Sequence, residues 1–496
     1  MRGNVSTASR LIVVSNREPY EHVWRKGQLI CRPTDGGLSS ALDPILRRVG
    51  GLWVAWGSGE ADREVNGNSE TIDVPPEAPT YRLRRVWLTP EEVKGGYLGY
   101  ANEVLWPLCH VTLDRVAYHR SFWKPYADLN RRFADAVLDE LKERPVPVWV
   151  HDFHLSLVPQ LIKQASPRTR VLVFWHVPWP APDVFRILPE RVEILRGLLA
   201  ADSIVFQTSA YGEAFAECAR RFLQTTVDQK RQVVTVQDHQ TSLGARAISV
   251  DFDAFSTRAK TAQVERLMVS ARRRLNIHPG VRMGLGVDRL DYTKGLLKRL
   301  WALDAFFTRY PEYRGAFTFV QVAVPTRSEL DAYRRYRKLI WQTVFEVNDR
   351  HSFARQKQES GAVEGWRPIE YLEGKIDFDT LVAYYRLADL GLVSSVYDGM
   401  NLVAKEYIAS QVDERGVLLV SQMAGSAEEL TDALIINPYD PDGLADAIRE
   451  ALEMPEEERR RRMRAMRAYL TRHDLYAWAD GCLQAAGLSP SGRPSE

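Results

Sequence analysis

The segment Val287–Gly295, VDRLDYTKG, carries two cations around a turn between an apolar run and a helical pattern at Leu296–Phe307. A strand-to-helix turn points backbone N–H groups and the positive end of the helix dipole outward, and both favour an anion such as phosphate. Arg289 and Lys294 could hold a diphosphate there and stabilise it as a leaving group. An ordinary βα turn with a helix cap and surface bases explains this segment alone equally well.

A second segment, Tyr397–Tyr407 (YDGMNLVAKEY), follows the apolar run Leu390–Val393. Gly399 allows the backbone to approach a ligand closely, and Asp398 is an acceptor for sugar hydroxyls. Glu406 could accept hydrogen bonds from both ribose hydroxyls of a nucleotide, as an acidic residue does in dinucleotide-binding folds. An Asp-Gly turn followed by a helix start is an equally good interpretation of this segment alone.

A glycine pair, Gly36 and Gly37, precedes a helical pattern in the segment Asp35–Ser40. Such a pair can cradle phosphate, but the P-loop and G-x-G-x-x-G spacings are absent from the sequence. An ordinary glycine turn is therefore the better interpretation of this segment unless other segments support a phosphate site.

Histidines end two of the predicted strands. His151 and His154 flank Asp152, which suggests a metal site, but histidines of an extended strand at this spacing would point to opposite faces. No H-E-x-x-H motif is present, so recognition of a hydroxyl group by Asp152 is the better interpretation. His176 precedes Val177 and a proline, where a stiff, extended loop could position its ring against a ligand. A lone histidine at such a place is more often structural.

Short apolar runs alternate along the chain with longer helical patterns. The runs have little polar alternation, as is typical of strands buried on both faces, and strand–helix alternation predicts parallel sheets. Strands are predicted at Leu11–Ser15, Pro147–His151, Arg170–Trp175, Ser203–Gln207, Met283–Val287, Thr318–Val322, Ile369–Leu372, Leu390–Val393, Val417–Val420 and Leu434–Ile436. Helices are predicted at Ala210–Phe222, Arg266–Leu275, Leu296–Phe307, Glu329–Asn348 and Gly443–Leu452.

A polar, basic stretch around residues 251–280 separates two predicted α/β domains, 1–250 and 251–470. Ligands bind at the carboxyl ends of parallel strands, so two such sheets that face each other would place a cleft between them. A C-terminal helix within 471–488 is expected to pack back on the first domain. The tail 489–496 is rich in Ser, Pro and Gly and is expected to be disordered.

The chain has 496 residues, with 66 Lys+Arg and 64 Asp+Glu, and a formal net charge of +2. This balance argues against nucleic acid or an anionic membrane as the main partner, because binding either of them concentrates positive charge. The four cysteines lie far apart, which excludes a disulfide framework and a cysteine-based zinc site. The apolar run Leu11–Val14 is too short for a signal peptide, and no run approaches the length of a membrane helix, so we expect a cytoplasmic protein.

Many separate motifs occur in the order found in the trehalose-6-phosphate synthase family, which the sequence resembles over nearly its whole length. They are SNR, GGL, GGLW…W, NEVLWP, HDFH, HVPWP, DRLDYTKG, DGMNLVAKEY and NPYD. The resemblance implies an α/β fold of the GT-B type, with two Rossmann-like parallel-sheet domains facing across a cleft. It also implies a retaining glycosyltransferase that moves glucose from a nucleotide sugar, usually UDP-glucose, to glucose-6-phosphate. The products would be α,α-trehalose-6-phosphate and a nucleoside diphosphate.

The resemblance also implies roles for individual residues. Acceptor binding is expected from Arg17, Trp56, Tyr97, Trp106, Asp152 and Arg327, with the two arginines on the acceptor phosphate. Donor binding is expected from Gly36, Gly37, His176, Arg289, Lys294, Asp398, Gly399, Met400, Asn401, Leu402, Val403, Ala404, Lys405 and Glu406. Trp106 and Val177 would control which acceptor anomer fits. The residues expected at the catalytic centre are Asp152, His176, Arg289, Lys294 and Asp398.

The implied mechanism needs no enzyme nucleophile, because the acceptor attacks from the face that the departing phosphate leaves, and this phosphate takes the acceptor proton. The rate would then come from orientation and from stabilisation of the leaving group. No metal or other cofactor is expected, since Arg289 and Lys294 supply the charge. The expected partners are small-molecule substrates rather than nucleic acid or membrane. A homo-oligomer is compatible with the sequence, and a separate phosphatase is expected because no phosphatase domain follows.

Three departures from the family pattern bear on specificity. The polar segment 348–366, expected to be a loop, is longer than usual and lies near the base, so the preference for UDP, ADP or GDP stays open. Tyr397 replaces the more usual arginine, and Ile248–Asp251 replaces a P-I-G-I-D-like hinge segment. Two other functions stay open: a transferase with another phosphorylated acceptor, such as glycerol-3-phosphate or a cyclitol phosphate, and a non-catalytic sugar-phosphate sensor.

Overall fold

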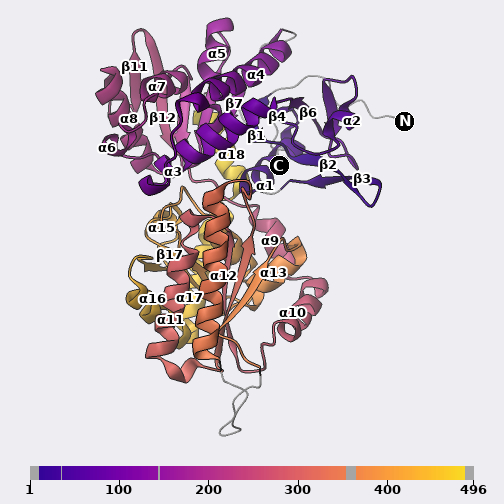
Figure 1. Cartoon of the computed structure of the whole chain (residues 1–496), viewed down its shortest axis with the longest axis vertical. Helices are drawn as coiled ribbons and strands as arrows, with labels where there is room; N and C mark the ends of the chain where they lie inside the picture. The colour runs from indigo at the N-terminus through magenta and orange to yellow at the C-terminus, as the bar shows by residue number, and fades with distance from the viewer. Residues whose placement is uncertain (1–10, 35, 143–145, 353–364, 486, 488–496) are drawn as a thin grey trace. The chain divides into compact units, whose positions relative to one another are not determined.

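The computed structural model describes residues 11–34, 36–142, 146–352, 365–485 and 487 (Figure 1). The chain divides into two compact units, one of Met1–Ala247 with Tyr476–Glu496 and one of Ile248–Leu475. Each unit is built around a sheet whose central strands are parallel, so the predicted α/β class is confirmed. In the described ranges no helix combines the length and the apolar character needed to span a membrane. The tail predicted to be disordered lies outside the described residues.

The main sheet of the first unit has the strand order β10-β11-β12-β9-β8-β7-β1-β4-β6-β5. Neighbours from β12 to β6 in this order pair in parallel. At the edges, β5, β10 and β11 pair antiparallel with their neighbours, so antiparallel strands extend the predicted parallel sheet there. Successive strands joined by short turns can only pair antiparallel, because a parallel neighbour needs a long crossover.

The strands of the first unit include a separate antiparallel hairpin, β2–β3, beside the main sheet. Their bounds are β1 (Ile12–Arg17), β2 (Tyr20–Arg25), β3 (Gln28–Pro33), β4 (Leu52–Trp56), β5 (Thr71–Val74), β6 (Tyr81–Val86), β7 (Val148–His151), β8 (Val171–Trp175), β9 (Ser203–Phe206), β10 (Thr226–Asp228), β11 (Val233–Val236) and β12 (His239–Ala245). The central strands are buried on both faces. Trp53, Trp149 and Trp175 are at most 1% exposed, so much of the aromatic content is core.

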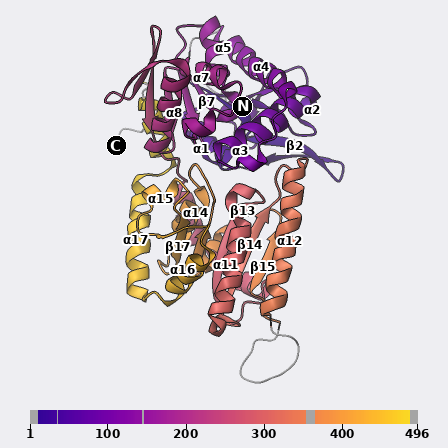
Figure 2. The same cartoon turned by 60° about the vertical axis from the view of Figure 1, so that its left-hand side comes forward.

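Helices cover the main sheet of the first unit (Figure 2). They are α1 (Gly37–Val49), α2 (Asp62–Asn66), η1 (Glu92–Leu105), α3 (Trp106–Cys109), η2 (Leu113–Arg115), η3 (Arg120–Phe122), α4 (Trp123–Leu141), η4 (Phe153–Leu155), α5 (Val158–Ala165), α6 (Pro182–Phe185), α7 (Arg191–Leu199), α8 (Ser209–Leu223) and α18 (Leu475–Ala485).

The π-helix η1 was not predicted, because its glycine-rich sequence lacks a clear helical apolar period. Its glycines serve close packing instead. A Cβ atom on Gly95 would lie 2.7 Å from the Pro125 ring, and one on Gly99 would lie 2.7 Å from the Phe122 ring. These contacts bring η1 against α4 and fix the helix that carries Tyr97.

The last helix, α18, packs on the first unit although the chain reaches it after the second. Trp478 is 3% exposed, and its ring centroid lies 5.4 Å from that of Trp149 and 5.0 Å from that of Phe174. The guanidinium of Arg48 lies 5.1 Å from the ring centroid of Tyr476. The helix therefore completes the core beside β7 and β8.

The second unit has one parallel sheet with the order β15-β14-β13-β16-β17-β18. The strands are β13 (Arg282–Arg289), β14 (Phe317–Val324), β15 (Ile369–Glu373), β16 (Leu390–Val393), β17 (Val417–Ser421) and β18 (Leu434–Ile436). This order places β13 and β16 side by side at the point where the order reverses. Ligands bind outside the carboxyl ends of strands at such a point.

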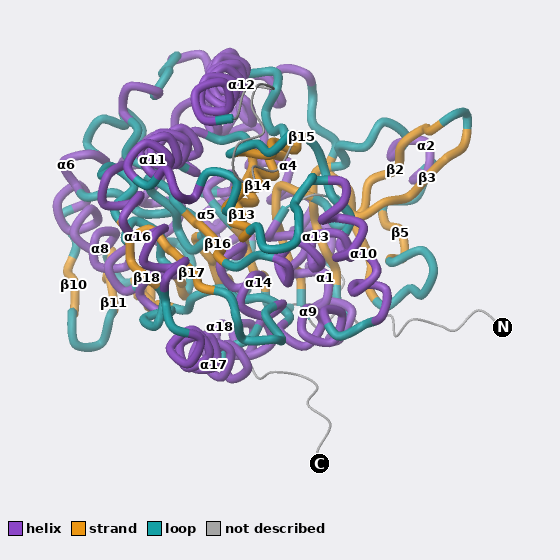
Figure 3. Tube along the Cα trace, turned by 90° about the horizontal axis from the view of Figure 1, so that it is seen from below, coloured by secondary structure: helices purple, strands orange, loops and turns teal. Residues whose placement is uncertain are grey.

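Helices cover both faces of this second sheet, with α11 and α12 on one side and α10 and α13 on the other (Figure 3). The helices are α9 (Phe252–Ala259), α10 (Ala262–Arg274), η5 (Tyr292–Lys294), α11 (Leu296–Arg309), η6 (Pro311–Tyr313), α12 (Asp331–His351), α13 (Phe378–Leu387), α14 (Leu402–Ser410), α15 (Ser426–Glu429), α16 (Pro441–Glu453) and α17 (Glu456–Arg472). The sheet is thereby buried on both faces, as its apolar strands predict.

The predicted loop at 348–366 begins later than expected, because α12 continues to His351. The Asn348 side chain exchanges two hydrogen bonds of 2.9 Å with the backbone of Ile369 in β15, and His351 Nε2 lies 2.7 Å from Asp304 Oδ1. These contacts hold the last helical turn against its neighbours. The central part of the segment, 353–364, lies outside the described residues.

Candidate active site

In the first unit, four predicted site residues lie at the carboxyl edge of adjacent parallel strands. Arg17 ends β1, Trp56 ends β4, Asp152 follows β7 and His176 follows β8. The side chain of Arg17 is exposed, and the other three residues are partly exposed. The strand order β8-β7-β1-β4 therefore gathers residues that are far apart in the sequence along one edge.

A row of rings continues this edge. The ring centroids of Trp56 and Tyr97 lie 5.1 Å apart, and Tyr97 stacks on His154 at 5.7 Å. His154 lies 4.0 Å from Phe153, which lies 5.8 Å from Trp106. The structure thus brings Trp56, Tyr97 and Trp106 together and adds His154, which the sequence analysis considered only as a metal ligand. His154 lies in the turn η4 rather than in an extended strand, so the argument from strand alternation does not apply to it.

Asp152 and His176 contact each other at the ends of β7 and β8. The amide of His176 donates to Asp152 Oδ1 at 3.4 Å, and the amide of Asp152 donates to Phe174 O at 2.9 Å. Asp152 has a φ of 73°, a backbone conformation that is uncommon outside glycine. This backbone aims the carboxylate, which is the predicted hydroxyl acceptor, from a fixed position.

The ring of His176 contacts interior partners. Its Nε2 lies 3.0 Å from Nδ1 of His151, and its Nδ1 lies 3.5 Å from Nε2 of Gln207. Burial lowers the pKa of His176 to about 3, and burial with the neighbouring His176 lowers the pKa of His151 well below its ordinary value. Both rings are therefore neutral near pH 7, so His176 can orient its neighbours but is poorly suited to take up a proton.

Three further predicted residues of the first unit lie near helix starts and in the core. Gly37 begins α1, and Gly36 is its N-cap with a φ of 142°, which only glycine adopts readily. Both glycines are exposed, which is compatible with an anion at the start of this helix. Val177 is 5% exposed, so it shapes the site through packing. Asp35 lies outside the described residues.

In the second unit, the two motifs of the sequence analysis meet. Lys294 Nζ lies 2.6 Å from Asp398 Oδ2, and both side chains are nearly buried, at 13% and 10% exposed. Asp398 Oδ2 also accepts from Ser395 Oγ at 3.0 Å and from Asn401 Nδ2 at 3.1 Å. Arg289 ends β13, the strand that leads into the turn of Lys294. The predicted diphosphate cations and the predicted sugar acceptor therefore belong to one cluster.

Helix α14 starts within this cluster. Asn401 caps it, with a φ of 78° and a hydrogen bond of 3.3 Å from the amide of Ala404 to its Oδ1. The amides of Leu402 and Val403 lie in the first turn, where helix N–H groups have no partner within the helix. Before the cap, Gly399 packs on the chain at Gly425, and the Met400 carbonyl accepts from the amide of Ser426 at 2.9 Å. These contacts fix the turn from Asp398 to the helix.

Two predicted donor residues further along α14 have interior partners. Lys405 Nζ lies 2.5 Å from Glu429 Oε2 and donates to Ile248 O at 2.8 Å, and its side chain is fully buried. Lys405 therefore lies away from the Lys294 cluster. Glu406 accepts a hydrogen bond of 2.6 Å from the Tyr385 hydroxyl, and burial raises its pKa.

Arg327, predicted on the acceptor phosphate, lies in the second unit beside Asp291. Its Nη1 lies 3.2 Å from Asp291 Oδ2 and 2.5 Å from the Tyr333 hydroxyl, and its side chain is 8% exposed. Burial alone would raise the pKa of Asp291, but the charges of Arg327 and Arg289 hold it below its ordinary value. A hollow of about 820 Å³ opens beside this pair and is lined by Leu290 and Tyr333 among others.

No group of three His, Cys, Asp or Glu side chains that could hold a metal ion occurs among the described residues. The HDFH segment is among the described residues, and there His151 faces His176 while His154 stacks on Tyr97. Both histidines therefore have roles in packing and orientation.

Comparison with known proteins identifies the family. The sequence pattern of glycosyltransferase family 20 matches residues 9–487. The chain belongs to glycosyltransferase family 20. A bifunctional trehalose-6-phosphate synthase/phosphatase of Thermoproteus tenax is 37% identical over 480 residues, which cover 95% of this chain and 62% of that protein. The chain thus spans less than two thirds of the length of that relative.

Solved structures resemble the family 20 chain over nearly their whole length. An alpha,alpha-trehalose-phosphate synthase (UDP-forming) from Burkholderia xenovorans, in complex with glucose-6-phosphate, has a TM-score of 0.84 at 30% identity and covers 97% of this chain and 100% of that chain. A structure described as trehalose-6-phosphate from E. coli bound with UDP-2-fluoro glucose has a TM-score of 0.84 at 31% identity. The match covers 96% of this chain and 99% of that chain. The GT-B fold class, with two α/β units built on largely parallel sheets, is confirmed.

Proposed function

We propose that this protein transfers glucose from UDP-glucose to glucose-6-phosphate with retention and yields α,α-trehalose-6-phosphate and UDP. The observation that carries the proposal is the contact between Lys294 and Asp398, which joins the two predicted donor motifs at the carboxyl ends of β13 and β16. The B. xenovorans protein is called UDP-forming and was solved with glucose-6-phosphate, and the E. coli protein was solved with UDP-2-fluoro glucose. These ligands support both substrates proposed here.

The donor half of the proposal rests on charge. Arg289 and Lys294 supply two cations for a diphosphate, and the amides of Leu402 and Val403 at the start of α14 supply hydrogen-bond donors. Asp398 forms an ion pair with Lys294. When the donor binds, Lys294 turns to a phosphate oxygen and Asp398 accepts from a glucose hydroxyl.

The acceptor half rests on the edge of the first sheet. Arg17 offers an exposed guanidinium, which can bind a phosphate with two hydrogen bonds. Trp56 and Tyr97 form the adjacent aromatic wall, and Asp152 accepts from acceptor hydroxyls. Arg327 is the proposed second phosphate ligand, and binding would exchange part of its contact with Asp291 for the phosphate.

The chemical step is proposed to need no base from the protein. The anomeric oxygen of the acceptor forms a bond to C1 of glucose while the bond from C1 to the diphosphate oxygen breaks, and that oxygen takes the acceptor proton. His176 is unsuited to this role, because its pKa is low and its ring nitrogens face His151 and Gln207. The rate acceleration is then proposed to come from stabilisation of the departing diphosphate by Arg289 and Lys294.

Because Arg289 and Lys294 supply positive charge for the diphosphate, we propose that the reaction requires no divalent metal. We place the reaction in the cytoplasm, since the four cysteines are free thiols, as is typical of a reducing compartment. The phosphate of the product would be removed by a separate phosphatase.

Purified full-length protein, assayed with UDP-, ADP- and GDP-glucose against glucose-6-phosphate and glycerol-3-phosphate, tests the proposal through release of nucleoside diphosphate. We expect turnover with glucose-6-phosphate, the highest kcat/KM with UDP-glucose and no loss of rate in EDTA. Turnover with glycerol-3-phosphate alone would establish a different acceptor. Binding of both ligands without turnover would establish a sensor, and loss of rate in EDTA would overturn the metal-free mechanism.

A further inference from the structure

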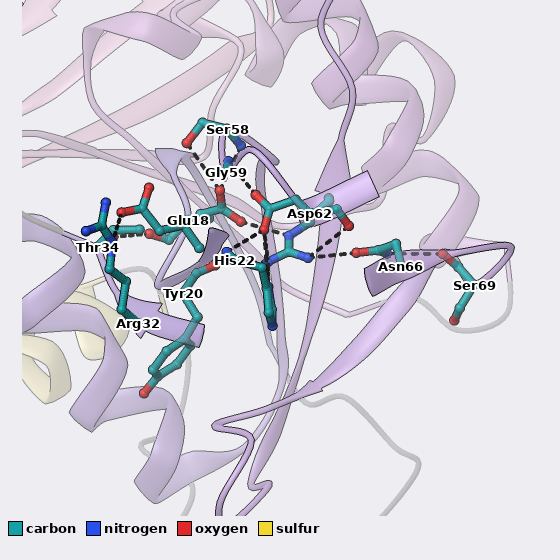
Figure 4. Close-up of polar contacts among 12 residues, drawn as sticks. Glu18, Tyr20, His22, Arg32, Thr34, Ser58, Gly59, Asp62, Asn66 and Ser69 are labelled. Atoms are coloured by element: carbon teal, nitrogen blue, oxygen red, sulfur yellow. Dashed lines mark hydrogen bonds and ion pairs between the residues drawn. The ribbon is translucent and has the colours of Figure 1, made fainter. Parts of the chain in front are cut away.

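A fully buried ionic cluster lies in the first unit, next in sequence to the acceptor residue Arg17. Figure 4 shows the polar contacts around two of its members, Glu18 and Asp62. Its members are Glu18, Asp62 and Arg85, and the side chain of each is 0% exposed. They come from the residue after β1, from α2 and from β6. Burying three ionisable groups is costly unless each is paired, so the contacts of the cluster decide what it does.

Arg85 holds the cluster together. Its Nε donates to Glu18 Oε2 at 2.8 Å, and its Nη2 lies 2.8 Å from Asp62 Oδ1. Its Nη1 donates to Asn66 Oδ1 at 2.9 Å, and its Nη2 also lies 2.9 Å from His22 Nδ1. His22 also contacts Asp62, since its amide donates to Asp62 Oδ1 at 2.8 Å and its Nδ1 lies 3.2 Å from the same oxygen.

The two carboxyl groups hold the loop that follows β4. Glu18 Oε1 accepts from the amide of Ser58 at 2.7 Å, and Asp62 Oδ2 accepts from the amide of Gly59 at 2.5 Å. A Cβ on Gly59 would lie 2.6 Å from Asp62 Oδ2, so only glycine allows this approach. Arg85 links the two carboxyl groups, since it contacts both Glu18 and Asp62.

This loop and the end of β1 carry two proposed acceptor residues. Glu18 directly follows Arg17, and Ser58 lies two residues after Trp56. Arg17 and Trp56 are themselves opposite each other, at the irregular end of the β1–β4 pairing. The hydrogen bond from the Ser58 amide to Glu18 therefore joins the two chain segments just beyond the irregular end of the β1–β4 pairing.

We infer that Glu18, Asp62 and Arg85 are positioning residues that hold Arg17 and Trp56 at the spacing needed to bind the phosphorylated acceptor. The inference rests on the proposed function. None of the three groups reaches solvent, so they act on the acceptor only through the backbone of their neighbours. Their loss should weaken acceptor binding more than donor binding.

The charge of the cluster makes the inference testable. Burial raises the pKa of Glu18 to about 8, against the opposing charge of Arg85, so near pH 7 the Glu18 carboxyl is mostly neutral. Burial alone would raise the pKa of Asp62, but hydrogen bonds from His22 and Glu18 hold it below its ordinary value. One carboxylate then balances one guanidinium, and loss of the Glu18 proton adds an unbalanced negative charge.

The first experiment compares R85K with R84K at pH 7 in the transferase assay. Arg84 is the adjacent buried arginine of β6, but it pairs with Asp139 and Glu140. For R85K we expect the KM for glucose-6-phosphate to rise about tenfold, because lysine cannot reproduce the fork of hydrogen bonds. The KM for UDP-glucose should change less than about twofold, and R84K should leave both constants near wild type.

Equal rises in both constants, or an equal effect of R84K, would show a merely structural role. Failure of the wild type to turn over glucose-6-phosphate would instead refute the proposed function. The two failures are therefore distinguishable.

The second experiment uses E18Q, which keeps the size of the side chain, removes its titratable proton and keeps the test valid if R85K does not fold. The amide can accept from only one of the two donors, the Ser58 amide and Arg85 Nε, so the test compares pH profiles rather than values at one pH. The titratable and charged groups that face Glu18 are Arg85, Asp62, His22 and Cys31, and burial raises the pKa of Cys31 to about 11. We expect the wild-type KM for glucose-6-phosphate to rise about fivefold between pH 7 and 9, above the second phosphate pKa of about 6. The KM of E18Q for glucose-6-phosphate should stay flat between pH 7 and 9, whatever its value at pH 7, and a rise parallel to that of wild type would overturn the inference.

Discussion

Replacement of Glu18 by glutamine should change how the stability of the protein depends on pH. In the folded chain the pKa of this carboxyl is raised from 4.5 to about 8, chiefly by burial. Between these values the unfolded chain has lost the proton and the folded chain keeps it, so the free energy of unfolding falls as pH rises. Each pH unit costs about 1.4 kcal/mol, so the loss sums to about 5 kcal/mol between pH 4.5 and 8.

The E18Q variant has no proton to lose, so its free energy of unfolding should lack this decline. Urea titrations of wild type, E18Q and R84K at pH 5, 6, 7 and 8, followed by tryptophan fluorescence, measure the effect. Wild type and R84K should lose stability across the series, whereas E18Q should be flatter by about 1 kcal/mol or more per pH unit. If the free energies of unfolding of E18Q and wild type declined in parallel with pH, Glu18 would not be the buried group that loses a proton, and the charge argument would fail.

Three further substitutions test other parts of the structure. R289A should lower kcat for UDP release by about 10²- to 10³-fold, because one of two leaving-group cations is lost. G295A should lower the melting temperature strongly, because the φ of Gly295 is 69° and an added Cβ would overlap a backbone carbonyl. The control G280A, where φ is 88° but the surrounding space is open, should lower the free energy of unfolding by only about 1 kcal/mol. W478A should destabilise the first unit in urea by about 3–5 kcal/mol, whereas W341A, at a side chain 60% exposed, should change stability by less than about 0.5 kcal/mol.

The predicted strands were found because each is a short apolar run, and most of them are buried on both faces. Leu390–Val393 and Leu434–Ile436 even have the predicted bounds. β4 (Leu52–Trp56) is equally apolar but was not among the predicted strands, and its two tryptophans belong to the GGLW…W motif. The strands β10 and β12 lack the apolar signal, because most of their residues are polar and few are buried.

The candidate site was predictable where chemistry lies within one segment. The motifs around Lys294 and Asp398 each had a local pattern, and the structure brings them together. Glu18, Asp62 and Arg85 have no such pattern, since each is an ordinary charged residue and only the register of β1, β4 and β6 brings them into contact. Buried partners of this kind become visible only when the fold is known.

The position of α18 has a consequence for the order in which the chain folds during synthesis. Trp478 packs on Trp149 and Phe174 of the first unit, yet all of Ile248–Leu475 must leave the ribosome before that helix emerges. Domains generally fold from the N-terminus as they appear. The first unit must therefore wait, with part of its core uncovered, until the second unit has been made. A nascent chain arrested within Ile248–Leu475 should expose the site of Trp478 to chaperones and proteases.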